Sequence, residues 1–234
     1  MKITVIIPVF NELKTIRAII DKILNLTDLD IQIILVDDFS TDGTRELIEN
    51  ELSKKVDKVV FHSSNQGKGS AIISAKKFIK GDIVIIQDGD LEYEPKDYYK
   101  LIKPILENSF KIVYGSRVLK KRRYKANNFT SLFRIFCNHI LTIISNFINS
   151  QNLTDAHTCY KVFKSEVFKE IILEEKGFNF CPEITTKVSN LGIKIFEVPI
   201  SYNGRTYKEG KKIKFIDGIE AIITILKYKL FIKK

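Results

Sequence analysis

The most constraining feature of this sequence is a series of short apolar runs, each followed by a segment with helical spacing. The runs are rich in β-branched residues and apolar on both faces, which is typical of strands buried in a parallel sheet. They predict strands at 3–9, 31–36, 58–61, 83–86 and 111–114, and helices at 12–24, 42–52, 68–79 and 98–106. We therefore expect an α/β fold with a mostly parallel central sheet, right-handed crossovers and flanking helices.

The second half of the chain has a different character. Residues 117–125 carry six cations and no acid, and residues 203–214 form a second basic stretch with two glycines. The periodicity predicts strands at 159–163 and 193–200, and helices at 130–148, 183–191 and 215–232. The chain has no internal repeat and no clear linker, so the sequence predicts a single domain over residues 1–234.

Composition limits the class of protein. With 44% hydrophobic and 28% charged residues, the chain has the balance of a globular protein. The net charge of +10 favours polyanionic partners such as nucleotides, nucleic acid or an anionic membrane. Three cysteines without a CxxC pair argue against a disulfide framework and fit a reducing compartment. No apolar stretch is long enough to predict a spanning helix.

Polar side chains follow three of the predicted strands directly. Because the carboxyl ends of parallel strands meet at one edge of a sheet, these side chains should converge there. An acidic edge in a basic protein requires a counter-charge, which a divalent cation bridging to phosphate would supply. The residues concerned are Asn11 and Glu12 after the first strand, Asp37 and Asp38 after the second, and Asp88, Asp90 and Glu92 after the fourth.

The acidic triplet after the fourth strand predicts a metal site. Asp88, Asp90 and Glu92 alternate, so in an extended loop their carboxylates face the same side. Ligands that are all oxygen suit Mg²⁺ or Mn²⁺. A solvated acidic turn is the plainer interpretation of such a triplet. The apolar strand immediately before it favours the metal site.

Two neighbouring motifs have structural alternatives. Asp38 is expected to face a ligand, while Ser40 or Thr41 caps a helix that starts at Asp42. The glycine-flanked Lys68 precedes a helix, where backbone N–H groups can approach a phosphate. An ordinary junction between a loop and a helix explains the second motif equally well.

Taken in order, the segments IPVFNE, VDDFSTDGT, NQGKGSA, QDGDLEYEP, YGSR and DAHTCYKVF resemble family 2 glycosyltransferases. Within that family the chain is most similar to the dolichol-phosphate mannose and glucose synthases. The resemblance implies a GT-A fold, a donor that is a GDP- or UDP-linked sugar, a Mg²⁺ or Mn²⁺ cofactor and inversion at the anomeric carbon. It also implies a nucleotide-sugar-binding half at 1–116 and an acceptor half at 117–234 that ends in an amphipathic helix.

The same resemblance implies roles for individual residues. Asp88, Asp90 and Glu92 would hold the metal and the diphosphate, while Arg117, Arg205 and, more weakly, Lys211 would face an acceptor phosphate. We expect Asp90, Arg117, Arg205 and Asp155 to act in catalysis. The resemblance assigns Pro8, Phe10, Glu12, Val36 and Asp38 to the nucleotide-sugar, and we expect Asn11, Lys68 and Asp88 to bind it as well.

The expected reaction is transfer of a hexose to a polyprenyl phosphate, either dolichyl or undecaprenyl. Such a phosphate is already mostly dianionic at neutral pH and needs no general base. The rival is transfer to a sugar hydroxyl, for which Asp155 or Glu183 would be the base. A third interpretation pairs Arg117 with Asp155 and leaves the basic loop solvated. No nucleic-acid partner is expected, because the acids cluster at the strand ends. A nucleotide sensor would have no need for Arg117 and Arg205.

The last predicted helix suggests how such an enzyme meets a lipid. Residues 215–232 carry an apolar face, which either packs on the core or, with the tail 230–234 and the basic residues 120–125, touches lipid. The apolar helix 130–148 would accommodate the first isoprene units. We therefore expect a cytoplasmic protein, peripheral at the inner face of a membrane or attached to a membrane anchor subunit.

Overall fold

The computed structural model describes residues 1–119, 129–205 and 215–231. The first half alternates strands and helices as predicted: β1 (Lys2–Val9), α1 (Ile16–Leu24), β2 (Asp30–Asp37), α2 (Thr44–Asn50), β3 (Lys58–Phe61), α3 (Lys68–Ala75), β4 (Ile83–Ile86), α4 (Tyr98–Leu106) and β5 (Ile112–Ser116). The second half is mainly helical: α5 (Phe129–Asn149), β6 (Lys161–Lys164), α6 (Ser165–Glu170), α7 (Phe180–Asn190), β7 (Phe196–Pro199), α8 (Phe215–Leu226) and a π-helical turn at Lys227–Phe231.

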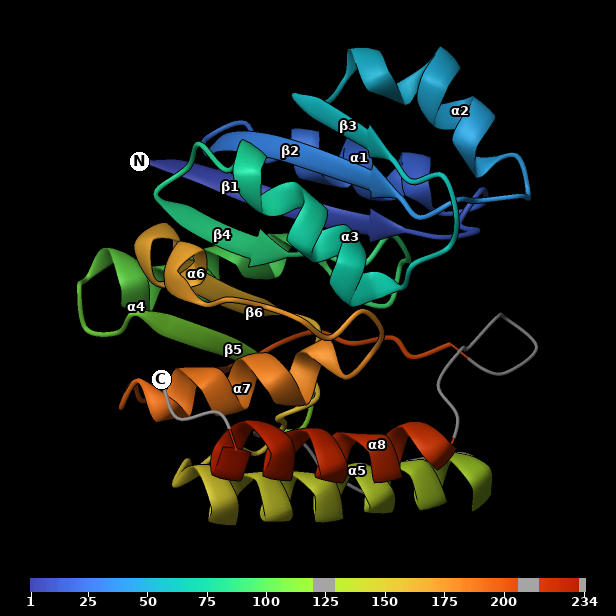
Figure 1. Cartoon of the computed structure of the whole chain (residues 1–234). Helices are drawn as coiled ribbons and strands as arrows, with labels where there is room; N and C mark the ends of the chain where they lie inside the picture. Colours follow the sequence, from blue (N-terminus) through green and yellow to red (C-terminus); the bar gives the residue numbers. More distant parts are fainter. Residues whose placement is uncertain (120–128, 206–214, 232–234) are drawn as a thin grey trace.

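The seven strands form one sheet in the order β3-β2-β1-β4-β6-β5-β7. Every pairing is parallel except those of β6, which runs antiparallel to both β4 and β5. Six carboxyl ends therefore share one edge, toward which the arrowheads of β1 to β4 point in Figure 1. The predicted α/β fold with a mostly parallel sheet is confirmed.

The centre of the sheet is buried on both faces. All four residues of β4 are fully buried, as are Ile6 and Ile7 of the neighbouring β1. Burying an isoleucine side chain contributes about 1.5–3 kcal/mol, so this layer is a major source of stability. The core also fixes where β1 and β4 end, and their ends carry the polar loops.

Several predicted boundaries are corrected by hydrogen bonding in the loops. The first helix begins at Ile16 rather than residue 12, because Glu12 takes part in contacts between loops. The second begins at Thr44 with Gly43 as its cap, at a φ of +94°. Ser40 and Thr41 are therefore not caps. The hydroxyl of Ser40 instead accepts the backbone N–H of Asn11 at 2.9 Å.

Helices α5 and α8 lie side by side, with α7 between them and the sheet (Figure 1). Helix α5 has an unusual polarity: its buried side chains include Thr142, Ser145 and Asn149. Several of its exposed side chains are large and apolar, and α8 also exposes large apolar side chains. We call the two sets the apolar stripes: Phe136, Ile140, Ile143 and Phe147 on α5, and Ile219, Ile223, Leu226 and Leu230 on α8 and its π-helical end.

Candidate functional site

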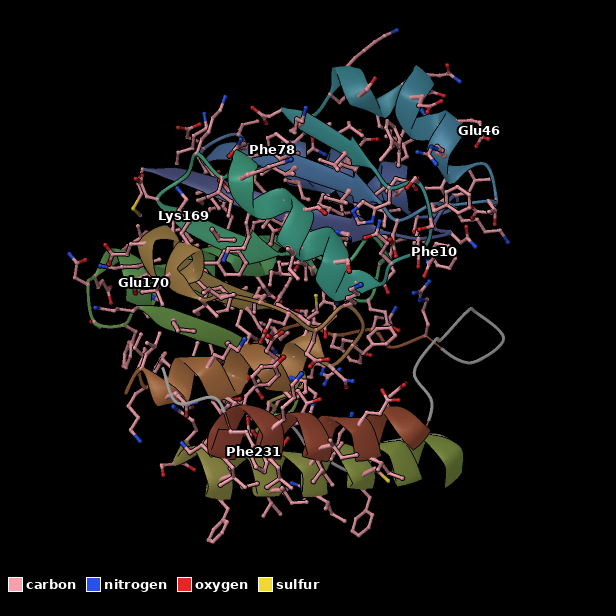
Figure 2. All side chains as sticks on the ribbon, in the orientation of Figure 1. Phe10, Glu46, Phe78, Lys169, Glu170 and Phe231 are labelled. Carbon is pink, nitrogen blue, oxygen red and sulfur yellow. The ribbon has the colours of Figure 1, made fainter. Side chains whose placement is uncertain are left out.

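The loops after β1, β2 and β4 meet at the carboxyl edge of the sheet, as predicted. Asn11 connects the first two, since its Oδ1 accepts the backbone N–H of Thr41 at 2.8 Å. Thr15 connects the first and third by donating its hydroxyl to the carbonyl of Gly89 at 3.0 Å. Phe10 lies at this edge in Figure 2. The sequence thus identified the edge, and hydrogen bonds hold its three loops together.

The centre of this edge is a cluster of carboxylates around Arg205. The guanidinium binds Glu12 through Nη1 and Nη2 at 3.0 and 3.1 Å. Its Nη2 also donates to Oδ2 of Asp90 at 2.7 Å. Glu12 and Asp90 are both buried. Arg205 therefore bridges the loops after β1 and β4 in this structure.

Glu92 ties the segment before Arg205 to the same edge. Its Oε2 accepts the hydroxyl of Tyr202 at 2.8 Å, and its Oε1 accepts the backbone N–H of Arg205 at 2.6 Å. Tyr93 forms an isolated antiparallel bridge with Tyr202. Both oxygens of this predicted metal ligand are thus engaged by residues 202–205.

A second ion pair lies beside the cluster. The Lys68 ammonium contacts Oδ1 of Asp88 at 2.5 Å and Sγ of Cys159 at 3.4 Å. Burial alone would raise the pKa of Asp88, but the ammonium lowers it below its usual value. Asp90 behaves differently. Burial, together with the charges of Asp88 and Glu92, raises its pKa to about 7, and Arg205 only partly opposes this rise.

These carboxylates fit a divalent cation by their chemistry. Four of them, Glu12, Asp88, Asp90 and Glu92, face two cationic side chains, so negative charge is in excess. Every donor is oxygen, which suits Mg²⁺ or Mn²⁺. Within the described residues, however, no three His, Cys, Asp or Glu side chains already form a ligand set. The carboxylates are paired with Lys68 and Arg205 instead.

Asp38 does not face open solvent, although the sequence predicted that it faces a ligand. Its Oδ1 contacts Nδ1 of His62 at 2.7 Å, and its two oxygens accept the backbone N–H groups of Gln66 and Gly67 at 2.8 and 2.7 Å. It therefore fastens the glycine-flanked loop to the end of β2. Val36 is also fully buried, paired in register with Pro8 of β1.

Arg117 and Asp155 form a buried ion pair, the third of the interpretations left open by the sequence. Nε and Nη2 of Arg117 bind the two carboxylate oxygens at 2.7 and 2.8 Å. Burial opposes ionisation of Asp155, but Arg117 lowers its pKa below the usual value. The Arg117 guanidinium also lies 5.1 Å from the ring centre of Tyr202. The other predicted acceptor residue, Lys211, lies outside the described residues.

Glu183, the other candidate base, is fully buried away from these loops. Its carboxylate accepts the backbone N–H groups of Glu174 and Glu175 at 2.8 and 3.0 Å, and the Lys187 ammonium at 2.8 Å. A carboxylate held by three donors has a structural role at the start of α7. Neither candidate base is therefore free in this structure.

Sequence reasoning missed several residues that support the site. Tyr202 joins Glu92 to Arg117, and Glu197 accepts the backbone N–H groups of Thr154 and Asp155 at 2.6 and 2.9 Å. Tyr202 stands three residues before Arg205, so its place beside the basic loop could have suggested it. Glu197 lies within a predicted strand and carries no such signal.

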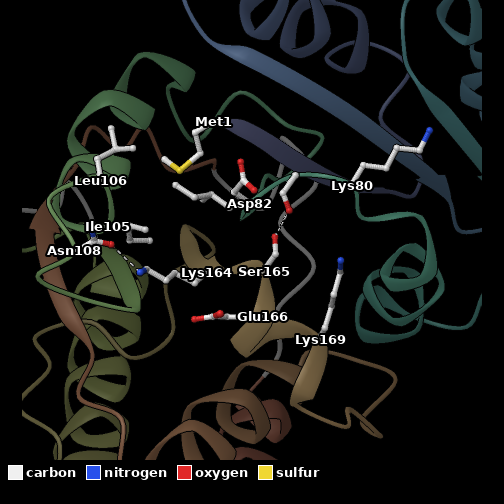
Figure 3. A pocket seen from close by; sticks show the side chains of 12 residues that line it. Met1, Lys80, Asp82, Ile105, Leu106, Asn108, Lys164, Ser165, Glu166 and Lys169 are labelled. Carbon is white, nitrogen blue, oxygen red and sulfur yellow. Dashed lines mark hydrogen bonds between the residues drawn. The ribbon is translucent and has the colours of Figure 1, made fainter.

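A pocket of about 680 Å³ lies at the opposite edge of the sheet, at the amino-terminal ends of β1 and β4. Figure 3 shows Met1, Asp82, Lys164 and Glu166 around it, with Lys164 bonded to Asn108. None of the predicted site residues lines it. Ligands of open α/β sheets bind at the carboxyl ends of the strands, so we assign the site to the carboxylate edge.

Known proteins and one family model match most of this chain. The family model described as glycosyl transferase family 2 matches residues 4–172. An uncharacterized protein of Methanocaldococcus jannaschii is 30% identical over 98% of this chain and 93% of its own length. The dolichol-phosphate mannosyltransferase of Pyrococcus furiosus is 30% identical over 90% of this chain, and glycosyltransferase AglJ of Haloferax volcanii is 30% identical over 87%. The chain spans 59% and 63% of the lengths of these last two relatives.

Solved structures show the same fold. Glucosyl-3-phosphoglycerate synthase from Mycobacterium tuberculosis, in complex with Mn²⁺, UDP and phosphoglyceric acid, superposes with a TM-score of 0.70 at 18% identity, over 100% of this chain and 80% of the other. A mannosyltransferase from Pyrobaculum calidifontis, in complex with GDP-Man and Mn²⁺, has a TM-score of 0.56 at 17% identity, over 98% and 70%. The predicted GT-A fold is confirmed by these neighbours.

Proposed function

The chain belongs to glycosyl transferase family 2, and we propose that it transfers a hexose from a nucleoside diphosphate sugar to the phosphate of a polyprenyl phosphate. The first half of this proposal concerns the donor and the second the acceptor. The donor is GDP- or UDP-linked, and the reaction inverts the anomeric carbon. Dolichyl and undecaprenyl phosphate are the acceptors that the motifs favour.

The donor would lie at the carboxylate edge. Asp88 and Asp90 would hold Mg²⁺ or Mn²⁺, and Glu92 would join them if it releases Tyr202 and the backbone of Arg205. The bound ion supplies charge that stabilises the departing diphosphate. Phe10 and Asn11, which follow β1, would contact the nucleoside. Structural neighbours that were solved with Mn²⁺ support the use of a divalent cation.

The observation that carries the acceptor proposal is the state of the two candidate bases. Asp155 is bound by Arg117 at 2.7 and 2.8 Å, and its pKa is lowered, so it is a weak proton acceptor. Glu183 is buried under three donors. A sugar hydroxyl needs a base, whereas a phosphate dianion attacks without one. The arrangement therefore favours a phosphate acceptor.

A lipid-linked acceptor would explain why the apolar stripes on α5 and α8 are exposed. A helix on the surface of a globular protein normally turns its apolar side inward, but α5 buries Thr142, Ser145 and Asn149 and exposes Phe147. Exposed apolar surface of this kind marks a contact with a membrane or with another protein. Within residues 1–119, 129–205 and 215–231, no helix is long and apolar enough to cross a bilayer. We propose that α5 and α8 lie against the inner face of a membrane or against a membrane anchor subunit.

The proposal is tested by product analysis. Purified protein is incubated with Mn²⁺, a panel of GDP- and UDP-linked sugars and a short-chain polyprenyl phosphate, and the products are identified by mass spectrometry. The expected product is a hexosyl phosphate lipid, formed from one or a few of the donors. Transfer to sugar hydroxyls with none to lipid phosphate would reject the acceptor and favour the rival function.

A further inference from the structure

We infer that Arg205 is a built-in counter-ion of the carboxylate edge, which a divalent cation has to displace before the guanidinium can serve an acceptor. The cation would first displace the Arg205 side chain from the carboxylates, and the acceptor phosphate would then bind that side chain. The first part concerns only the free protein and a metal ion. The second part, which involves the acceptor, rests on the proposed function.

The guanidinium occupies the position of a bridging cation. It contacts Glu12 at 3.0 Å and Asp90 at 2.7 Å, and its Nε lies 3.8 Å from Oε1 of Glu92. These carboxylates come from two loops far apart in the sequence, and their side chains are at most 12% exposed. Ion pairs on the open surface are neither this buried nor shared among three acids.

Metal and guanidinium compete for one oxygen of Asp90. Oδ1 of Asp90 already accepts the backbone N–H of Glu92 at 3.0 Å, so Oδ2 is the oxygen of this carboxylate without a backbone donor. Oδ2 is the atom that Nη2 of Arg205 contacts at 2.7 Å. A Mg²⁺ ion needs oxygen ligands at about 2.0–2.1 Å, so it cannot share this space with a guanidinium nitrogen.

The charges favour the exchange. Glu12, Asp88, Asp90 and Glu92 together carry more negative charge than the single positive charges on Lys68 and Arg205 balance. A divalent ion would replace a single positive charge with two. In addition, the buried Nε of Arg205 makes no hydrogen bond to any residue that the structure describes. The guanidinium therefore leaves part of its donor capacity unused where it is.

The backbone limits how far Arg205 can move. Its N–H donates to Oε1 of Glu92 at 2.6 Å, and the carbonyl of Glu92 accepts the N–H of Asn203 at 2.8 Å. With these bonds kept, a displaced side chain stays close to the edge. Tyr202, which contacts both Glu92 and Arg117, links this position to the second arginine. Two arginines could then grip one phosphate.

Metal binding without any substrate tests the first part. Mn²⁺ is titrated into the wild-type protein and into Arg205→Ala and Arg205→Lys, and free Mn²⁺ is followed by electron paramagnetic resonance. Arg17→Ala is the matched control, because it removes an arginine whose partner, Glu51, lies outside the site. We expect Arg205→Ala to bind Mn²⁺ about tenfold more tightly, a difference of about 1.4 kcal/mol. Arg205→Lys should change the affinity in the same direction by a smaller factor.

An unchanged or weaker Mn²⁺ affinity in both Arg205 variants would overturn the inference. Circular dichroism shows whether each variant is folded, and the lysine variant remains interpretable if the alanine variant is not. The second part is read from farnesyl phosphate binding, which Mn²⁺ with nucleoside diphosphate should strengthen in the wild type but not in Arg205→Ala. Loss of this second result alone would contradict the proposed acceptor and leave the metal exchange standing.

Discussion

Three of the functional carboxylates are paired with a cation from another part of the chain. Asp90 contacts Arg205, Asp88 contacts Lys68, and Asp155 contacts Arg117. Breaking a buried pair leaves an uncompensated charge, which is far more costly than losing a surface pair. These residues therefore stabilise the free protein and are available to substrates only by exchange of partners.

Asp90→Ala should lower turnover by at least about 100-fold, because the cation that stabilises the leaving diphosphate loses a ligand. The fold should survive, since Arg205 keeps its two hydrogen bonds to Glu12 when Asp90 is removed. Initial rates with saturating Mn²⁺ and donor measure the loss, and circular dichroism checks the fold. Turnover near that of the wild type would contradict the role of Asp90.

His157 should make the protein less stable as the pH falls. Burial and the nearby Lys161 lower its pKa to about 4; Arg117 acts in the same direction, and Asp155 opposes it. A histidine in the unfolded chain has a pKa near 6.5. Between about pH 6.5 and 4, the unfolded chain therefore binds a proton at His157 that the folded chain does not bind. Stability is thus complete above this window and falls within it, by at most about 3 kcal/mol.

His157→Gln removes the titrating group and should flatten this part of the pH profile. The measurement is the free energy of unfolding in urea at pH 7.0, 5.5 and 4.5 for both proteins. Other groups titrate equally in the two chains, so their difference isolates His157. A difference that does not change with pH would show that the folded protein accepts the proton.

At the scale of single residues, the sequence identified the chemistry but not the pairings. Asp88, Asp90 and Glu92 could be recognised from their alternation after an apolar strand. The contact between Arg205 and Glu12 could not be recognised, because 193 residues separate the two and no local pattern connects them. The assignment of Arg117 and Arg205 to an acceptor phosphate stays a prediction, since both are engaged within the protein here.

Among the elements, the pair α5 and α8 departs most from ordinary packing. The sequence predicted both helices and an apolar face on the second, but periodicity cannot tell which side of an amphipathic helix faces inward. The direction of β6 could not be predicted either, because a short apolar run has the same pattern whether the strand is parallel or antiparallel to its neighbours. Helix α6 was not predicted because its six residues are too few to show a helical periodicity.

The apolar stripe on α5 should be required for binding to vesicles. Ile143 and Phe147 are 53% and 88% exposed, so the double substitution Ile143→Ser and Phe147→Ser removes lipid contacts without opening the core. We expect at least about a tenfold loss of co-sedimentation with anionic liposomes at low salt, since each buried CH₂ contributes about 0.8 kcal/mol. Leu24→Ser is the matched control, because Leu24 is a similarly exposed apolar residue on α1. Equal binding by all three proteins would contradict a contact between the apolar stripes and the membrane, and would favour an anchor subunit.

For the whole molecule, nucleotide binding should depend on the cation. A nucleoside diphosphate should raise the melting temperature only when Mg²⁺ or Mn²⁺ is present, because the diphosphate otherwise faces an excess of carboxylates. Duplex DNA should have no comparable effect despite the net charge of +10. Differential scanning fluorimetry compares the conditions. Equal stabilisation by the nucleotide without metal would contradict the cation site.

The overall architecture was the most predictable level, because buried parallel strands, connecting helices and polar strand ends all have local signatures in the sequence. The family followed from the order of the motifs. The division into halves at residue 116 stays a prediction, since one sheet contains strands from both sides of it.

The central claim is that the acceptor is a phosphate and not a hydroxyl. It is tested most directly by offering the enzyme an equimolar mixture of a short-chain polyprenyl phosphate and the matching polyprenol, with Mn²⁺ and the preferred donor. The two lipids differ only in the phosphate, so chain length and apolar contacts are matched. The account predicts that the hexose appears on the phosphate, with the polyprenol left unmodified. Hexosyl polyprenol as the main product would contradict it.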